Sequence, residues 1–369
     1  MKKIEESLQL ILEEAVDLKH PNPNVINVNA EELAEEIEMA LMDPEGTSLM
    51  IWGAPGIGKT KIVSSVLEAA SKPGQPIMRL IDVATPNMAP DDWALPAVKE
   101  METGWQAMDI PKNWLPVWTP TGDPEEDAKR NDAANMGNGG ILFFDELSRA
   151  SSAVQNTCLK LIDERKIGQS RLGDKWVMIA ASNREGDDPT SEINFSTALG
   201  NRFSQINFVP DFDSWKQWAH GKVDQRILDF LEFNRDDFYT LDDEDESGIF
   251  ASPRSWAAAS ESLSRQMQYA KDKGVPLTAK RLTRAIGKNI GKGIAERLAA
   301  FLKLMETWSP ADLRQVFTDP GKARLPKKAG TGYDLAESAA VLSMLVTTTK
   351  DRELTPRRIC PISRNILLG

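Results

Sequence analysis

The stretch Gly53-Ala54-Pro55-Gly56-Ile57-Gly58-Lys59-Thr60 decides the fold of this chain. It follows the apolar run Ser48–Trp52, which predicts a short buried strand, and it precedes residues 61–67, whose spacing predicts a helix. In a strand, glycine-rich turn and helix of this kind, backbone N–H groups surround phosphate oxygens and the helix dipole adds positive charge. A glycine-rich turn can also simply join a strand to a helix, but the full eight-residue pattern favours a nucleotide site.

The side chains of this stretch have distinct expected tasks. Gly53 and Gly58 let the backbone curl around phosphate oxygens, Lys59 neutralises the terminal phosphates, and the Thr60 hydroxyl ligates Mg²⁺. The residues that we expect to bind the nucleotide are Gly53, Pro55, Gly56, Ile57, Gly58, Lys59, Thr60 and Lys61.

The composition is typical of a globular protein with more than one domain. The chain has 369 residues, 41% of them hydrophobic, which is enough for two or three cores. No apolar run is long enough to span a bilayer, and Glu13 and Glu14 interrupt the apolar region that export would require. We therefore expect a cytoplasmic protein that does not bind membranes. With two Cys and two His, neither a disulfide framework nor a zinc site is predicted.

The charge is unevenly distributed along the sequence. Lys and Arg number 44 and Asp and Glu number 55, so the formal charge is 44 − 55 = −11, which on average repels nucleic acid. Residues 271–303 differ, because nine basic and two acidic residues give a local balance of 9 − 2 = +7. This basic patch keeps a nucleic-acid partner open as an alternative, although a solvated helical face is the simpler interpretation.

Further apolar runs predict the rest of a parallel, five-stranded α/β sheet. They are residues 77–83, 141–146, 176–181 and 205–209. Helices are expected at residues 4–18, at about 30–42 with Asn29 as the cap, and after Ser151, where Cys158 would be a core residue. Residues 84–140 are too many for an ordinary crossover, so we expect an ordered insertion whose tryptophans either pack locally or contact a partner. Residues 166–174 are typical of a hairpin.

Polar side chains end two of the expected strands and precede a third. Asp145 and Glu146 end one strand, where Asp145 would hold Mg²⁺ and Glu146 would orient or deprotonate the attacking water. Asn183 ends the next strand and could hydrogen-bond the same water, although Asn in this position is often simple turn chemistry. Arg202 precedes the last strand, as a surface ion pair or as a finger that neutralises phosphoryl charge.

Beyond Pro210 the pattern becomes helical, and we expect four regions. They are an N-terminal helix (1–26), an α/β core (27–210) with its insertion near 84–140, an α-helical lid (211–325) and a C-terminal helical extension (326–369). Pro253 suits the first turn of a lid helix, and Arg254 would either reach a γ-phosphate or extend along the surface.

This succession of motifs resembles the AAA+ ATPases, and within them the MoxR-like group of the helix-2-insert branch. The resemblance spans about residues 27–310. Residues 53–60 resemble Walker A, 141–150 Walker B, 180–183 sensor 1, 199–203 the arginine-finger segment and 251–254 sensor 2. Residues 95–98, 105 and 114–116 resemble the inserted segment of the group, and residues 162–176 resemble its hairpin before sensor 1. Asn201 and Ser148 depart from the usual Asp and Asn, but neither departure removes a catalytic group.

The resemblance implies a ring, expected to be a hexamer, that binds ATP and Mg²⁺ between subunits. Lys59, Thr60, Asp145, Glu146 and Asn183 would act in their own subunit, and Arg202 in that of a neighbour. Whether Arg149 and Arg254 act in cis or in trans is left open. Members of the group often work with partners that have a von Willebrand factor A domain, and they remodel proteins or assist metal-cofactor insertion. The first hypothesis is therefore a protein-remodelling ATPase, and the alternatives are a nucleic-acid motor and a nucleotide-dependent assembly switch.

Overall fold

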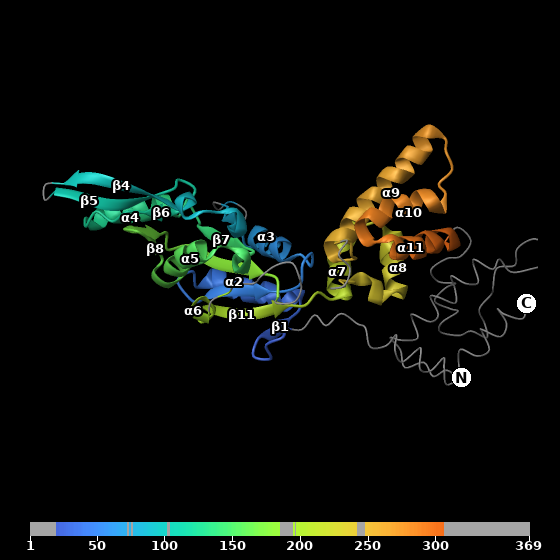
Figure 1. The fold of residues 1–369 in the computed structure, drawn as a ribbon, viewed down its shortest axis with the longest axis horizontal. Coiled ribbons are helices and arrows are strands. Elements are labelled where there is room, and N and C mark those ends of the chain that lie inside the picture. The colour runs from blue at the N-terminus through green and yellow to red at the C-terminus, as the bar shows by residue number, and fades with distance from the viewer. Residues whose placement is uncertain are drawn as a thin grey trace, which may run out of the picture. The chain divides into compact units, whose positions relative to one another are not determined.

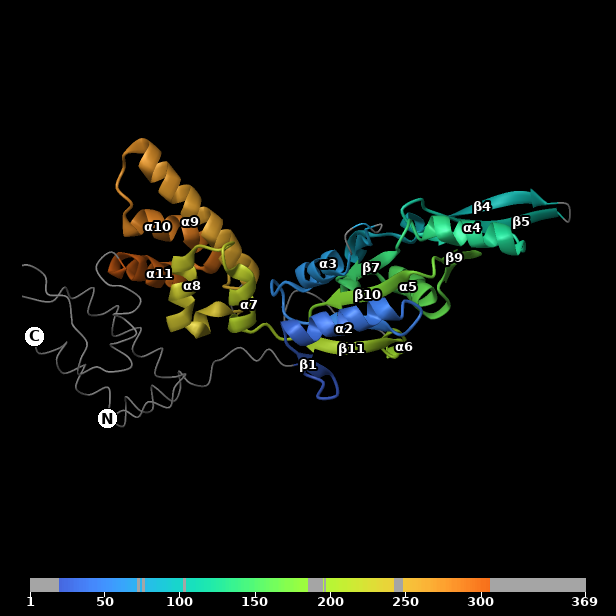
Figure 2. The same ribbon diagram turned by 180° about the vertical axis from the view of Figure 1, so that it is seen from behind.

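A computed structural model describes residues 20–71, 74, 77–101, 104–184, 195, 197–241 and 248–305. The chain divides into an α/β unit, Leu18–Ser214, and a second unit made of Met1–Asp17 with Trp215–Gly369, whose described part is residues 215–241 and 248–305. We call the second one the helical unit, and each unit is described by itself (Figures 1 and 2). The helix expected at residues 4–18 and the extension at 326–369 lie outside the described residues.

The α/β unit is built on a parallel sheet of six strands in the order β1-β11-β2-β10-β7-β3. The strands are β1 (Ile26–Val28), β2 (Ser48–Trp52), β3 (Arg79–Ala84), β7 (Gly140–Asp145), β10 (Trp176–Ser182) and β11 (Phe203–Phe208). Every residue of β2 and β10 is buried, as expected for central strands covered on both faces. The prediction of five strands was wrong by one, because β1 is a three-residue edge strand that pairs with β11 through Val28 and Phe208.

Three helices of the α/β unit follow local sequence signals. Helix α2 (Ala30–Met42) begins at the predicted cap, where the Asn29 side chain and the Glu32 side chain form a capping box. Helix α3 (Lys59–Ala70) follows the glycine-rich stretch and packs against α2, and α5 (Ser152–Glu164) is capped by Ser151. Cys158 on α5 is fully buried, which raises the pKa of its thiol and confirms a core residue.

The described residues of the segment between β3 and β7 form regular structure, as predicted. It contains the 3-10 turns η1 (Thr85–Asn87) and η2 (Pro90–Asp92), the antiparallel hairpin of β4 (Ala94–Met101) and β5 (Gly104–Pro111), β6 (Val117–Trp118) and α4 (Pro124–Ala134). The hairpin extends away from the central sheet in both views (Figures 1 and 2). Strands β8 (Lys166–Ile167) and β9 (Ser170–Leu172) form the predicted second hairpin, and β9 also pairs with β6.

The tryptophans of this segment divide between the two interpretations. The Trp93 side chain is 0% exposed and contacts Trp114 and Phe144, with ring centroids 5.4 and 5.9 Å apart. The Trp105 side chain on β5 is 70% exposed. One tryptophan therefore belongs to the core and the other is open to solvent.

The helical unit packs around its own core. After the short α6 (Thr197–Gly200) of the α/β unit, α7 (Phe212–Ala219) spans the division between the units and is followed by α8 (Gln225–Phe233) and η4 (Arg235–Phe238). Helices α9 (Pro253–Lys273), α10 (Ala279–Ile290) and α11 (Lys292–Leu304) complete the unit. Trp256, Phe230 and Phe301 are buried and contact one another through Phe230. Within the described residues, no helix is both long and apolar enough to cross a membrane.

Candidate nucleotide site

The glycine-rich stretch joins β2 to α3 in a conformation that leaves the start of the helix open. Gly58 precedes α3 with φ +100°, a left-handed value that glycine tolerates, and no side chain caps the first N–H groups of the helix. A Cβ at Gly58 would meet nothing within 4 Å, whereas at Gly53 it would lie 2.7 Å from Ile57 Cδ1. The stretch therefore offers uncapped donors at a helix N-terminus, which is the arrangement that phosphate binding needs.

The Lys59 side chain lies across the stretch. The ammonium donates hydrogen bonds to the carbonyl oxygens of Gly53 (2.7 Å) and Ala54 (3.1 Å) and to Oδ1 of Asn183 (3.0 Å). The Lys59 side chain is buried, and a buried ammonium is stabilised only by close acceptors. The structure therefore brings Lys59, which opens α3 after β2, next to Asn183, which follows β10, because β10 pairs with β2.

A hydroxyl and a carboxylate, both of which suit Mg²⁺, meet at the same edge of the sheet. The Thr60 hydroxyl donates to Oδ2 of Asp145 over 3.4 Å. Asp145 ends β7, and its backbone carbonyl accepts a 2.7 Å hydrogen bond from the buried Thr85 hydroxyl. Burial, and then the charge of Asp145, raise the pKa of Asp82 on β3. Hydroxyl and carboxylate oxygens are ligands that Mg²⁺ accepts, so these residues fit the ion.

Glu146 has an unusual backbone. The residue adopts φ 52° and ψ 39°, a left-handed conformation that a non-glycine residue rarely takes, which explains why β7 stops at Asp145. The Glu146 N–H donates to Oδ1 of Asp145 (3.1 Å), and Arg149 Nη1 lies 3.4 Å from Glu146 Oε2. The turn is tied to β10, because the N–H of Ser148 donates to Oγ of Ser182 (2.9 Å). Backbone strain of this type is common where a side chain must point into a reaction site.

One predicted site residue of the α/β unit, Arg202, is not brought to this edge. Arg202 precedes β11, so it lies at the amino-terminal end of the sheet, whereas the glycine-rich stretch follows the carboxyl-terminal end of β2. A six-residue strand separates the two ends by about 20 Å. Arg202 donates to the carbonyl oxygen of Ala198 (2.7 Å) and pairs with Asp163 (3.1 Å). Arg254 is exposed in the first turn of α9, in the helical unit.

Sequence reasoning overlooked Thr85 and gave Arg149 no definite task. Thr85 follows β3, next to the carboxylate strand β7, and a polar residue directly after a strand was the available signal. Arg149 lies three residues after Glu146, so its ion pair needed only the turn of η3 (Leu147–Arg149). Among the described residues, no three His, Cys, Asp or Glu side chains form a group that could hold a metal ion by themselves.

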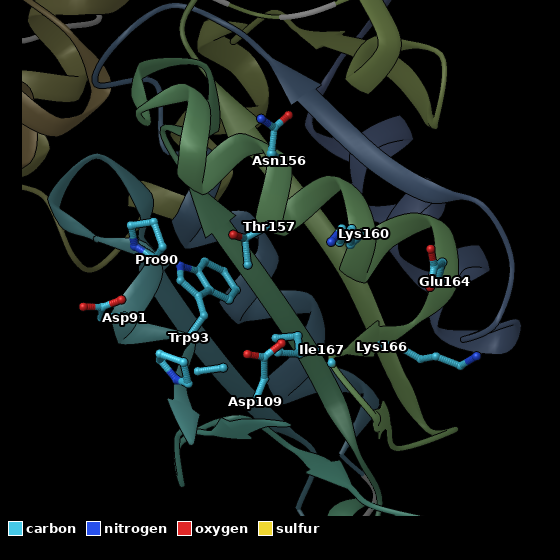
Figure 3. A pocket seen from close by; sticks show the side chains of 13 residues that line it. Pro90, Asp91, Trp93, Asp109, Asn156, Thr157, Lys160, Glu164, Lys166 and Ile167 are labelled. Carbon is cyan, nitrogen blue, oxygen red and sulfur yellow. The ribbon is translucent and has the colours of Figure 1, made fainter. Parts of the chain in front are cut away.

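A hollow lies on the side of α5 that faces the insertion. Its volume is about 410 Å³, and it is lined by α5, by η2 and by the bases of the two hairpins. Figure 3 shows Asn156, Thr157 and Lys160 along α5, with Pro90 and Trp93 facing them. The indole N–H of Trp93 is buried and has no hydrogen-bond partner among the described residues. The hollow is lined by apolar side chains such as Pro90, Trp93 and Ile167 and by charged ones such as Asp109 and Lys160.

Comparison with known proteins identifies the type of domain. Residues 100–203 match the AAA domain of the dynein-related subfamily, a range that includes Asp145, Glu146, Asn183 and Arg202. A search of curated protein sequences found no match. Among solved structures, similarity is found to the Holliday junction branch migration motor RuvB of Thermotoga maritima, at 13% identity and a TM-score of 0.37, covering 78% of this chain and 76% of that chain. Similarity is also found to domain III of the replication initiation protein DnaA of Thermotoga maritima, at 16% identity and a TM-score of 0.39, covering 70% of this chain and 92% of that one.

The domain match agrees with the parallel sheet and with the strand, glycine-rich turn and helix at residues 48–70. The chain therefore has the α/β P-loop fold of an AAA+ domain, followed by a helical region.

Proposed function

We propose that this chain is an ATPase of the MoxR-like AAA+ type that assembles into a ring and remodels or activates a protein client. The observation that supports this function most is the convergence of Lys59, Thr60, Asp145, Glu146 and Asn183 at the carboxyl edge of one sheet. Phosphoryl transfer to water uses groups of these types, namely an ammonium, a hydroxyl, two carboxylates and an amide, gathered beside a helix N-terminus.

Each side chain of the site has a task in hydrolysis. Lys59 exchanges its carbonyl acceptors for the terminal phosphates, while the N–H groups of Gly58 and of the start of α3 receive the remaining phosphate oxygens. Thr60 and Asp145 would hold Mg²⁺, which supplies neutralisation of the phosphate charge when bound. Glu146 accepts a proton from the attacking water, and Asn183 orients that water through its amide. Arg149 lies 3.4 Å from Oε2 of Glu146, so its positive charge adjoins the proposed base.

The position of Arg202 supports a site completed by a second copy. The arginine lies at the opposite edge of its own sheet, so its guanidinium serves a phosphoryl group only if that group belongs to a neighbour. A closed ring, expected to be a hexamer, gives every copy such a neighbour. Arg254 at the start of α9 is a further candidate for the γ-phosphate, in cis or in trans.

The inserted hairpin supports a protein as the client. The β4–β5 hairpin exposes Leu95, Val98, Trp105 and Ile110 by 45, 66, 70 and 51%. Exposed apolar side chains gathered on one element are typical of a protein contact. The hollow beside α5 begins at the base of this hairpin, through Ala94, Pro96 and Asp109. A protein with a von Willebrand factor A domain is the expected type of partner for this group of ATPases.

The direct test is Glu146→Gln. This variant keeps the size of the side chain but removes the base, so ATP should still bind while turnover falls by about 10²–10⁴-fold. Binding is measured with a fluorescent ATP analogue and turnover by phosphate release. Glu68→Gln, on the exposed side of α3, is the matched control and should hydrolyse ATP at the wild-type rate. Unchanged turnover in Glu146→Gln would refute the assignment of the base.

A nucleic-acid motor is the second candidate, favoured by α10 alone. This helix has four basic and no acidic residues. Stimulation of ATP hydrolysis by DNA that disappears steeply with added salt would support it. A rate of ATP hydrolysis that DNA does not change at low salt would favour the protein client.

A further inference from the structure

Helix α2 presents a strongly acidic face. The helix contains five glutamates and no basic residue. Leu33 and Ile37 are buried against the α/β unit, so with 100° per residue the opposite side presents Glu31, Glu35 and Glu38. All three are exposed, and none of them pairs with a basic side chain among the described residues. The exposed Met39 and Met42 lie on this side as well, 53 and 81% accessible.

Helix α10 presents the opposite charge in the same way. Leu282, Ile286 and Ile290 are buried in the helical unit, and the other side presents Lys280, Arg284 and Lys288. Each of these is exposed and has no acidic partner in the described part of the chain, whereas Lys292 on the next helix pairs with Glu296. Leu277, 38% exposed, immediately precedes the cap of α10.

We propose that the acidic outer face of α2 in one copy docks on the basic outer face of α10 in a neighbouring copy. This inference rests on the proposed ring, and it names surfaces that hold the ring together. The faces are complementary in charge, similar in length (13 and 12 residues), and unsatisfied within their own units.

The spacing of the residues also fixes the direction of docking. Glu31, Glu35 and Glu38 rise by about 6 and 4.5 Å along α2, and Lys288, Arg284 and Lys280 follow one another by about 6 Å along α10. An antiparallel arrangement pairs them in this order, Glu31 with Lys288 and Glu38 with Lys280. The same arrangement brings the exposed Met42 toward Leu277. An apolar contact therefore follows the last pair of charged residues, Glu38 and Lys280. Antiparallel helix dipoles favour this direction too.

Charge reversal in two separate variants tests the contact in the full chain. Variant X combines Lys280→Glu, Arg284→Glu and Lys288→Glu, and variant Y combines Glu31→Lys, Glu35→Lys and Glu38→Lys. Sedimentation velocity with a non-hydrolysable ATP analogue measures assembly over a range of protein concentrations. Alone, X and Y each place like charges opposite one another, so assembly should weaken about tenfold or more. Mixed in equal amounts, they should assemble like the wild type, because every contact between X and Y joins opposite charges.

A matched control separates charge from position. The triple variant Lys222→Glu, Arg265→Glu and Lys303→Glu makes the same change of charge on exposed residues of the helical unit outside α10, and it should assemble normally. Thermal unfolding followed by circular dichroism shows that each variant is folded.

The outcomes separate this contact from the ring itself. Wild-type chain that stays monomeric with the ATP analogue overturns the ring and the contact together. If the wild type forms rings and variants X and Y each form rings of the same stability, the contact alone is overturned. If X and Y each assemble weakly and mixing them does not restore assembly, the contact between α2 and α10 is overturned as well. The two helix faces would then act within one copy or on another partner, such as an acidic polymer bound to α10.

Discussion

Thr85 shows how one buried hydroxyl positions the carboxylate end of β7. Its side chain is fully buried, and its hydroxyl donates a 2.7 Å hydrogen bond to the carbonyl oxygen of Asp145. The carboxylate of the same aspartate accepts from the Thr60 hydroxyl. The Asp145 carboxylate in turn accepts from the N–H of Glu146. A hydrogen bond from η1, directly after β3, to the last residue of β7 therefore holds the backbone that carries both carboxylates.

Thr85→Val tests this role. Valine keeps the shape but removes the donor, so we expect a loss of about 1–2 kcal/mol in the free energy of unfolding and a lower turnover number with little change in ATP affinity. Thr157→Val on α5, whose hydroxyl donates to its own helix, is the control and should change stability by less than about 0.5 kcal/mol. Urea unfolding and phosphate release check both variants. Wild-type stability in Thr85→Val would show that the bond does not position β7.

For individual residues, the sequence identified the chemical groups of the candidate site more closely than the contacts that these groups make. The eight-residue stretch and the residues after the apolar runs pointed to Lys59, Thr60, Asp145, Glu146 and Asn183, and the structure places these residues at one edge of the sheet. Their chemical roles remain predictions. The contact that Thr85 makes and the left-handed conformation of Glu146 could not be predicted, because they depend on how η1 and β10 pack against the end of β7. Those contacts join residues about 35 to 60 positions apart.

At the scale of elements, the insertion separates structural from exposed tryptophans. Trp105 on the hairpin is 70% exposed, so Trp105→Ala should change the free energy of unfolding by less than about 0.5 kcal/mol and leave basal ATP hydrolysis unchanged. Trp93 is 0% exposed between Trp114 and Phe144, so Trp93→Ala should cost about 3–5 kcal/mol. Thermal unfolding measures both, with Trp93→Phe as the milder variant. Equal losses for the two positions would mean that the hairpin packs against something in the folded chain.

The start of α8 gives a prediction about pH. Arg226 donates hydrogen bonds to the Asp224 carboxylate (2.9 and 2.6 Å), and these hold the pKa of Asp224 below its ordinary value. Because the pKa of Asp224 is lower in the folded than in the unfolded state, its carboxylate stabilises the fold at pH values above the unfolded pKa of 3.8. This stabilisation is lost as the pH falls through the pKa of the folded state.

Asp224→Asn should therefore lower the free energy of unfolding by about 1 kcal/mol or more at pH 7, and the difference should vanish below the folded pKa. Asn still caps a helix, so Asp224→Ala is the comparison that also removes the cap. Urea unfolding of the helical unit, followed between pH 7 and pH 2.5, measures the difference. A difference that persists at the lowest pH would contradict the role of the charge.

Elements with a strong local signal were predicted closely. Helix α2 begins and ends where the sequence placed it, because Asn29 and Glu32 form a cap that depends only on neighbouring residues. Strand β2 also has the predicted bounds. Strand β1 was overlooked because three residues carry too little pattern, and its pairing with β11 comes from residues nearly two hundred positions later. The hairpin of β4 and β5 was expected only as ordered structure, since its exposed faces lack the alternation of a half-buried strand.

At the scale of the whole molecule, the proposed catalytic groups are divided between two edges of one sheet. Lys59, Glu146 and Asn183 lie at the carboxyl end, and Arg202 lies at the amino end, where it pairs with Asp163. Within one α/β unit, Arg202 therefore does not reach the other proposed catalytic groups. The proposed hydrolysis therefore requires a site completed by a neighbouring copy.

Complementation between Lys59→Ala and Arg202→Ala tests that dependence most directly. Each variant alone should hydrolyse ATP slowly, since the first cannot bind the phosphates and the second cannot stabilise their charge. Asp163→Ala, which removes only the ion pair of Arg202, should keep the wild-type rate. In an equal mixture about half of the Arg202→Ala copies gain a neighbour that supplies the arginine, so about a quarter of the wild-type rate should return. A full rate in Arg202→Ala alone, or no recovery on mixing, would contradict a site shared between copies.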